Sequence, residues 1–331
     1  MGLPCFAVVQ AILLKRSLAL GLRFAAIAAI GVLLWLFARE LEWGKLASAL
    51  KNAKIWPLAV AAALNFACLW GKSACWRILL APKYHVKVSR LFRYTIAAFA
   101  TSVIAPARAG EVVRLWTLKR RDGVPVADAA AVAVAEKLLD GVSMLILVAP
   151  VPWLLPDLPA WVGEAILTCS AIAVVTLVAI YIAVGRVSDK EGGSWLRRFI
   201  AGMHVVRSPK RLVGALLSLI LVWVADLVMV NLVMYAVGID VSPAAGLLIL
   251  FTLNLTIMVP STPAQIGALE VGALAATDLL GIPREPALAF ALLYHALQVL
   301  PLLVAGLVLE LPLVLGKERV IPNDAEAARS S

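Results

Sequence analysis

Two short stretches, PARAG at Pro106–Gly110 and PAQIG at Pro263–Gly267, decide how this chain folds. Each combines a proline, a glycine and a polar side chain, and each stands beside long apolar runs. Proline removes a backbone donor and glycine weakens a helix, so both stretches predict a helix break in apolar surroundings. Irregular backbone at membrane depth is stable only where protein buries it or where it lines a cavity. We therefore expect the two breaks to face a shared interior site.

The composition is that of an integral membrane protein. Of the 331 residues, 63% are hydrophobic and 15% are charged, whereas soluble domains average about 45–50% apolar and about 25% charged residues. We expect one transmembrane domain over residues 1–310 and a polar cytoplasmic tail over 311–331. Apolar runs of about 20 residues can cross a bilayer as helices. The sequence predicts an all-α polytopic membrane protein with six full spans, at about 20–38, 56–80, 126–150, 160–184, 212–237 and 286–309.

The formal net charge of +10 is explained by membrane topology. Lysine and arginine gather in the segments 81–93, 106–125 and 185–211, and such basic loops face the cytoplasm. This places both termini in the cytoplasm and the chain in the inner (plasma) membrane of the cell. The exception is 39–55, which carries four basic residues although it must lie outside. No RNA- or DNA-binding module is visible, so we expect no nucleic-acid partner.

Two further apolar stretches, 94–105 and 245–280, do not fit as simple spans. Basic segments flank residues 94–105 on both sides, which predicts a re-entrant hairpin that enters from the cytoplasm and turns near Pro106. The loops on both sides of residues 245–280 are expected to be external. This predicts a second re-entrant hairpin, which enters from outside and breaks at Pro260–Pro263.

The two hairpins belong to an internal repeat. Gly123–Pro125 follows the first motif and Gly281–Pro283 follows the second at nearly the same distance, and each opens a span rich in alanine and leucine. A span–hairpin–span unit at about 55–150 therefore recurs at about 210–309, with the span 160–184 between the copies. The odd number of crossings inverts the second copy, an architecture whose ligand site lies near the midplane. Chance matching of short alanine-rich motifs is the alternative.

Ionisable side chains inside a membrane are costly and mark candidate functional sites. Around the first motif these are Arg108, Glu111 and Arg114, and Gly110 permits a close backbone approach. A helix that begins after the turn favours an anion at its N-terminus, and an arginine binds phosphate through two donors. These four residues are therefore predicted headgroup contacts. The alternative is that both arginines are ordinary cytoplasmic charges, with Arg114 paired to Glu111.

A second charged cluster lies inside the span 126–150. Glu136 and Asp140 share one helical face, and Lys137 adjoins them. At 1.5 Å per residue these groups are about 15–20 Å from the cytoplasmic end of the span. Two interpretations stay open: a structural clamp with Arg108, or the polar floor of a substrate cavity or a proton relay.

The second repeat offers counterparts to both clusters. Around PAQIG, we predict Gln265, Gly267 and Glu270 as further headgroup contacts. His295 is a residue type that titrates near neutral pH, although a buried, hydrogen-bonded histidine between helices is the alternative. The remaining candidates for a polar cavity or for proton coupling are Asp226, Tyr294 and Gln298.

The sequence shows no catalytic constellation. It contains no GxxxxGK[ST] phosphate loop, no GxSxG and no HExxH. The four cysteines have no metal-ligand spacing and the three histidines are scattered. We expect no catalytic residue, no metal and no cofactor, and therefore no enzymatic activity.

Four segments resemble one known family: APARAGEVVR, GVPVADAAAVAVAEKLLD, PSTPAQIGALE and LLYHALQVLP. Together they are similar to the flippase-like family of lysylphosphatidylglycerol synthase transmembrane domains, which includes hopanoid-associated members. The family usually shows Glu-Arg where this chain has Glu136-Lys137, and PGGxG where it has Pro263–Gly267. In bifunctional members a separate soluble domain transfers the aminoacyl group. Because this chain stops after VIPNDAEAARSS, the resemblance implies the lipid-handling part without the synthase.

The resemblance implies a translocator of anionic or aminoacylated lipid. We expect an anionic phospholipid, a hopanoid or a polyprenyl-phosphate lipid to move between leaflets through a polar cavity between the two repeats. One alternative is a secondary transporter of a small solute that uses the same inverted repeat. The other is a non-transporting partner of a membrane enzyme that modifies lipids.

Overall fold

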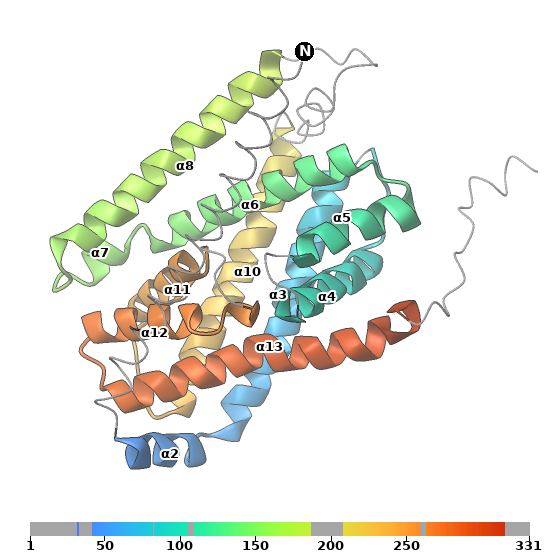
Figure 1. Cartoon of the computed structure of the whole chain (residues 1–331). Coiled ribbons are helices and arrows are strands. Elements are labelled where there is room, and N and C mark those ends of the chain that lie inside the picture. Colours follow the sequence, from blue (N-terminus) through green and yellow to red (C-terminus); the bar gives the residue numbers. More distant parts are fainter. Residues whose placement is uncertain are drawn as a thin grey trace, which may run out of the picture.

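The computed structural model describes residues 32, 42–81, 83–104, 109–186, 208–258 and 263–314, and these form helices joined by short loops (Figure 1). No strand occurs among them, so the predicted all-α class is confirmed for the described part of the chain. The predicted span 20–38 and the candidate Arg108 lie outside the described residues. The helices are α2 (Trp43–Lys51), α3 (Ile55–Leu80), α4 (Val88–Ile104), α5 (Ala109–Asp122), α6 (Val126–Val148), α7 (Val151–Leu154), α8 (Ala160–Arg186), α10 (Pro209–Ala236), α11 (Pro243–Ile257), η2 (Pro263–Gln265), α12 (Ala268–Leu279) and α13 (Arg284–Val314).

Four of the described helices are long and apolar enough to cross a membrane: α3, α8, α10 and α13. They coincide with four of the six predicted spans. The predicted span 126–150 is also a helix, α6, and its 23 residues have the required length. It differs from the other four because it carries Asp128, Glu136, Lys137 and Asp140. A helix with so many ionisable groups needs polar partners on other helices.

The central pair is α3 and α10, which lie against each other in the middle of Figure 1. Gly71 allows this close approach, because a Cβ there would lie 2.5 Å from Cγ2 of Val222. The Ser218 hydroxyl donates to the Gly71 carbonyl oxygen over 3.0 Å. Both helices are apolar over most of their length. Among their polar residues, Asn65 and Ser73 of α3 are buried, whereas Arg77 of α3 and Lys210 of α10 are exposed.

Two pairs of helices flank the motifs that opened the sequence analysis. Helix α4 ends at Ile104 and α5 begins at Ala109, while α11 ends at Ile257 and α12 begins at Ala268. The partners in each pair pack against each other, and the second pair is joined through η2. The longest of these helices has 17 residues, or about 25 Å, which is shorter than a hydrocarbon core of about 30 Å. These lengths accord with hairpins, although re-entrant placement stays a prediction.

Glycines bring the helices of each pair together. A Cβ at Gly110 would overlap the carbonyl oxygen of Ala98, so α5 lies directly on the backbone of α4. A Cβ at Gly272 would lie 3.1 Å from the carbonyl oxygen of Thr252, so α12 lies similarly close to α11. The first pair also reaches the second half of the chain, because α4 contacts both η2 and α13.

The loops that follow the two pairs have the same local geometry. Gly123 has φ +67 and Gly281 has φ +66, a left-handed conformation that glycine adopts without strain. Each is followed by a hydrophobic residue and a proline before the next long helix, α6 or α13. The predicted correspondence between these two segments therefore extends to their backbone conformation.

Helix α8 is set apart from the others (Figure 1). Only 6% of the residues in its apolar stretch are buried, against 33% in α3, α10 and α13. Among the described elements it packs against α6 and α7.

Candidate functional site

A polar stripe runs along one face of α3 and organises the interior. Its members are spaced three or four residues apart, which places them on one face of a helix. They bond to three neighbouring helices, α13, α10 and α6. Asn65 donates to the Leu297 carbonyl oxygen at 2.8 Å and Cys68 to the Val222 carbonyl oxygen at 3.6 Å, while Lys72 and Trp76 both reach α6, at Asp140 (3.2 Å) and Glu136 (2.6 Å).

The first charged group joins α3, α5 and α6. Nη1 of Arg114 lies 3.7 Å from Oε2 of Glu136, and both side chains are at least nine-tenths buried. The guanidinium of Arg114 lies over the indole of Trp76, 3.7 Å from the ring centroid. The same indole donates its N–H to Oε2 of Glu136. A buried ion pair that also has hydrogen-bond and cation–π partners is held in a fixed position.

Two hydrogen-bond donors of Arg114 are unused among the described residues. Its Nε and Nη2 are buried and have no hydrogen-bond partner within the described part of the chain. Buried donors without partners are rare in folded proteins and cost about 1–3 kcal/mol each. The neighbouring Glu111 is half-exposed and lies 3.6 Å from Lys137. Arg114 is therefore the predicted headgroup residue that the structure places in a buried polar position with donors available.

A second charged group lies one turn of α3 before Trp76, at Lys72. Nζ of Lys72 is 3.2 Å from Oδ2 of Asp140, and the indole of Trp223 donates to the backbone carbonyl oxygen of Asp140 over 3.1 Å. The other oxygen of Asp140, Oδ1, is buried and has no hydrogen-bond partner among the described residues. This group joins α3, α6 and α10 around one ion pair.

The third polar group contains Asp226, Tyr294 and Gln298. The Tyr294 hydroxyl donates to Oδ1 of Asp226 over 2.8 Å, and the Gln298 amide donates to the same hydroxyl over 3.0 Å. These three predicted cavity residues thus come together between α10 and α13.

A separate polar group holds the PAQIG turn. One oxygen of Glu270 accepts the Gly267 amide at 2.7 Å, and the other lies 2.6 Å from Nδ1 of His295. Nε2 of His295 lies 2.9 Å from the carbonyl oxygen of Ala264. Ala264 and Gln265 have φ values of +53 and +63, a conformation that costs a non-glycine residue about 1 kcal/mol or more. The buried His295–Glu270 pair therefore stabilises a strained turn.

Outside the spans, a further carboxylate ties the loop before α4 to α6. Asp128 lies 2.7 Å from Nζ of Lys83 and accepts a hydrogen bond from the Tyr84 hydroxyl. Burial raises the pKa of Tyr84, and the bond to Asp128 raises it further. Burial acts to lower the pKa of Lys83, but the hydrogen bond and the charge of Asp128 outweigh it, so that pKa is also raised.

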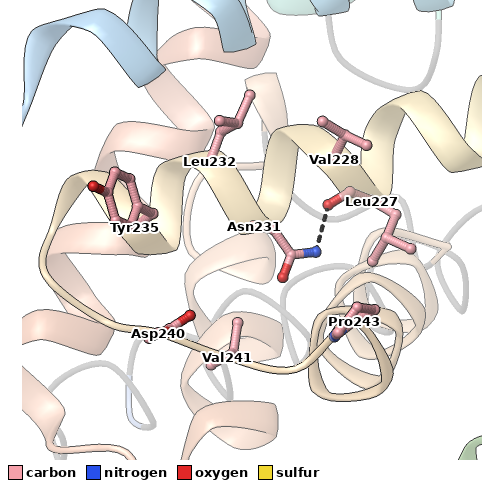
Figure 2. A pocket seen from close by; sticks show the side chains of 8 residues that line it. All are labelled: Leu227, Val228, Asn231, Leu232, Tyr235, Asp240, Val241 and Pro243. Atoms are coloured by element: carbon pink, nitrogen blue, oxygen red, sulfur yellow. Dashed lines mark hydrogen bonds between the residues drawn. The ribbon is translucent and has the colours of Figure 1, made fainter.

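A cavity of about 380 Å³ lies at the C-terminal end of α10 (Figure 2). Its floor carries Asn231, whose amide donates to the Leu227 carbonyl oxygen over 2.8 Å. The cavity is lined mainly by apolar side chains and does not include the charged groups on α3. Its lining residues are Leu227, Val228, Asn231, Leu232, Tyr235, Asp240, Val241 and Pro243.

The sequence predictions and the structure overlap in part. The structure brings Arg114, Glu136, Asp140, Asp226, Tyr294 and Gln298 onto helices around α3, and it gathers Gly267, Glu270 and His295 at the second motif. Gln265 is exposed, and Gly110 serves helix packing. Sequence reasoning missed Lys72, Trp76 and Trp223. A lysine in the middle of the apolar span 56–80 was a usable signal for the first of these.

The chain matches the lysylphosphatidylglycerol synthase TM region over residues 22–306. It belongs to this family. The match covers the two charged groups on α3, the Asp226–Tyr294–Gln298 group and the PAQIG turn, so the lysylphosphatidylglycerol synthase TM region includes every described candidate residue. A comparison with curated proteins gave no match. The family assignment and the apolar helices together establish an integral membrane protein.

Proposed function

We propose that this protein moves an anionic or isoprenoid-type lipid between the leaflets of the inner (plasma) membrane. Both termini are cytoplasmic in this proposal, and the two helix pairs α4–α5 and α11–α12 are re-entrant hairpins of an inverted repeat. The matching geometry at Gly123 and Gly281 supports the repeat. The contact between α4 and η2 supports a shared position for the two breaks.

The observation that carries the proposal is Arg114. A guanidinium in the interior of an apolar bundle, with two donors unmatched by the described residues, suits an anionic headgroup. Glu136 and Trp76 would hold the guanidinium while the lipid passes, and the acyl or isoprenoid tails would remain in the bilayer. The cycle involves no chemical conversion of the lipid. Within the described residues, no group of three or more His, Cys, Asp or Glu side chains could hold a metal ion.

Headgroup accessibility in proteoliposomes tests this function. Fluorescent anionic and zwitterionic lipids are quenched from outside in vesicles with wild-type protein, with Arg114→Gln, and with no protein. We expect wild-type protein to expose inner-leaflet anionic lipid, and Arg114→Gln to slow this about tenfold or more, because a charge-assisted hydrogen bond contributes about 1.5–3 kcal/mol. Arg108→Ala belongs in the same series.

Arg120→Gln is the matched control, since it removes an exposed arginine from the same helix. Arg114→Lys keeps the charge but loses the two-donor geometry, and intermediate transfer is expected. Transfer that equals empty vesicles, with folded protein in both orientations, would refute translocation. That result would favour the small-solute transporter or the partner of a lipid-modifying enzyme.

A further inference from the structure

We propose that Asp226, near the middle of α10, carries a proton in the resting protein and releases it during transport. The transport part of this inference rests on the proposed function, whereas the proton itself can be detected without any transport. Asp226 lies 17 residues after the first residue of the 28-residue helix α10, or about 26 Å along it.

Among the described residues, two of the three carboxylates around α3 have a buried cationic partner and the third does not. The three are Glu136, Asp140 and Asp226, and Lys137, which adjoins Glu136, is half-exposed. Arg114 pairs with Glu136 and Lys72 pairs with Asp140. Asp226 forms no ion pair in the described part of the chain. An unpaired carboxylate in an apolar interior takes up a proton instead of staying charged.

The immediate surroundings of Asp226 leave room for that proton. Oδ1 accepts the Tyr294 hydroxyl of α13, and Gln298 fixes that hydroxyl from one turn further along. The titratable groups that face Asp226 from α3 are Cys68 and Lys72, and α6 contributes Asp140. Helix α11, which also packs on α10, has no titratable side chain. Asp226 is partly buried by the described residues.

Lys72 links the protonation state of Asp226 to the other charged groups near α3. Its ammonium pairs with Asp140 and also interacts electrostatically with Asp226 and Glu136. When the Asp226 carboxyl group gives its proton to water, the new carboxylate competes with Asp140 for this ammonium. The link from α3 to α6 then weakens while attraction between α3 and α10 grows. The proton balance is simple, since one carboxyl group becomes one carboxylate and one proton enters water.

A proton suits this position better than a metal cation. Metal cations such as Ca²⁺ need several oxygen ligands, whereas Asp226 is accompanied by one tyrosine hydroxyl. The described residues contain no cluster of three or more His, Cys, Asp and Glu side chains suited to a metal ion.

Infrared difference spectroscopy of the purified full chain in H₂O and D₂O tests the site. We expect a carbonyl stretching band of a protonated carboxyl group at neutral pH, which disappears in Asp226→Asn and persists in Asp140→Asn. Asp226→Asn is nearly isosteric and neutral, so folding should be retained. Tyr294→Phe provides a second measurement, because loss of its hydrogen bond should shift the wild-type band. A band that neither variant changes would overturn the proposal.

Proteoliposomes with an imposed pH gradient test the coupling. Wild-type lipid movement should depend on the gradient, and movement in Asp226→Asn should be insensitive to it. Wild-type movement that ignores the gradient would refute coupling. If no lipid movement is detected but the infrared band depends on Asp226, the proposed function is refuted and the proton site is retained.

Discussion

Trp76 donates its indole N–H to Oε2 of Glu136 over 2.6 Å, and this bond connects α3 directly to α6. The same carboxylate oxygen lies 3.7 Å from Nη1 of Arg114, and the guanidinium of Arg114 lies over the face of the Trp76 indole. One tryptophan therefore orients both members of a buried ion pair. Its removal should disturb the carboxylate and the guanidinium together.

Trp76→Phe tests this arrangement, because phenylalanine keeps an aromatic face but has no N–H donor. We expect a loss of about 1–3 kcal/mol in the free energy of unfolding, since a buried acceptor loses a short hydrogen bond. Thermal unfolding in detergent measures the change. Trp70→Phe is the control on the same helix, where the indole is 48% exposed and lies edge-on to Phe92. Equal shifts in the two variants would contradict the assigned role of Trp76.

Gly110→Ala should destabilise the α4–α5 pair. The added Cβ would overlap the Ala98 carbonyl oxygen, which is backbone and cannot rotate away. Overpacking of this kind costs about 1–3 kcal/mol, and occasionally more. Gly141→Ala in α6 is the control, because a Cβ there meets nothing within 4 Å. That control should be neutral or slightly stabilising, since alanine favours helices by up to about 1 kcal/mol over glycine.

The PAQIG turn should tolerate glycine and reject a branched residue. Ala264 has φ +53, so Ala264→Gly relieves strain while adding freedom to the unfolded chain, and the two effects nearly cancel. Ala264→Val should destabilise by about 1–2 kcal/mol, because a branched Cβ is poorly suited to this conformation. Proteolysis rates of the two variants would compare them. Similar rates for Ala264→Gly and Ala264→Val would argue against a left-handed residue at this position.

Stability should fall at alkaline pH because of the Lys83–Tyr84–Asp128 group. Both raised pKa values mean that the folded state holds these protons more tightly than the unfolded chain does. Their stabilising contribution is complete below the ordinary values of 10.0 for tyrosine and 10.5 for lysine, and it is lost as pH rises through the folded values. Thermal unfolding between about pH 9 and pH 12, a window that extends above both ordinary values, measures this loss.

Asp128→Asn should reduce that alkaline decline, since it removes the charge that raises the pKa of Lys83 and that adds to the effect of burial on the pKa of Tyr84. The control is Asp157→Asn, which changes an exposed carboxylate in the loop before α8 and should leave the profile as in the wild type. A profile that Asp128→Asn does not alter would assign the alkaline loss to other groups.

Local chemistry explains which features the sequence could predict. Proline and glycine act on their own backbone, so the end of regular α-helix at Pro263–Gly267 could be predicted without knowledge of any contact. Ionised residues in an apolar span require partners, which made Glu136 and Asp140 candidates. The identity of those partners depends on how helices rotate and cross. Trp76 and Trp223 look like ordinary apolar residues in the sequence, yet each donates an indole N–H to the polar interior.

The two helix pairs, α4–α5 and α11–α12, likewise have features that the sequence predicts and features that it does not. The short helix lengths follow from the positions of proline and glycine, whereas the contact between α4 and η2 joins segments far apart in the chain. Helix α13 also approaches α4 closely, since a Cβ at Gly306 would overlap Cβ of Ala100. Nothing in the isolated pattern around Gly306 marks it as a contact to α4.

Helix α8 is much less buried by other described residues than the long apolar helices α3, α10 and α13. Within the described chain its protein neighbours are few, so we expect lipid tails to cover most of its surface. Lipid tails do not distinguish leucine from isoleucine or valine by shape, as a packed core does. The residues of α8 should therefore be interchangeable among apolar types. We expect its sequence to vary among relatives while its length and hydrophobicity are retained.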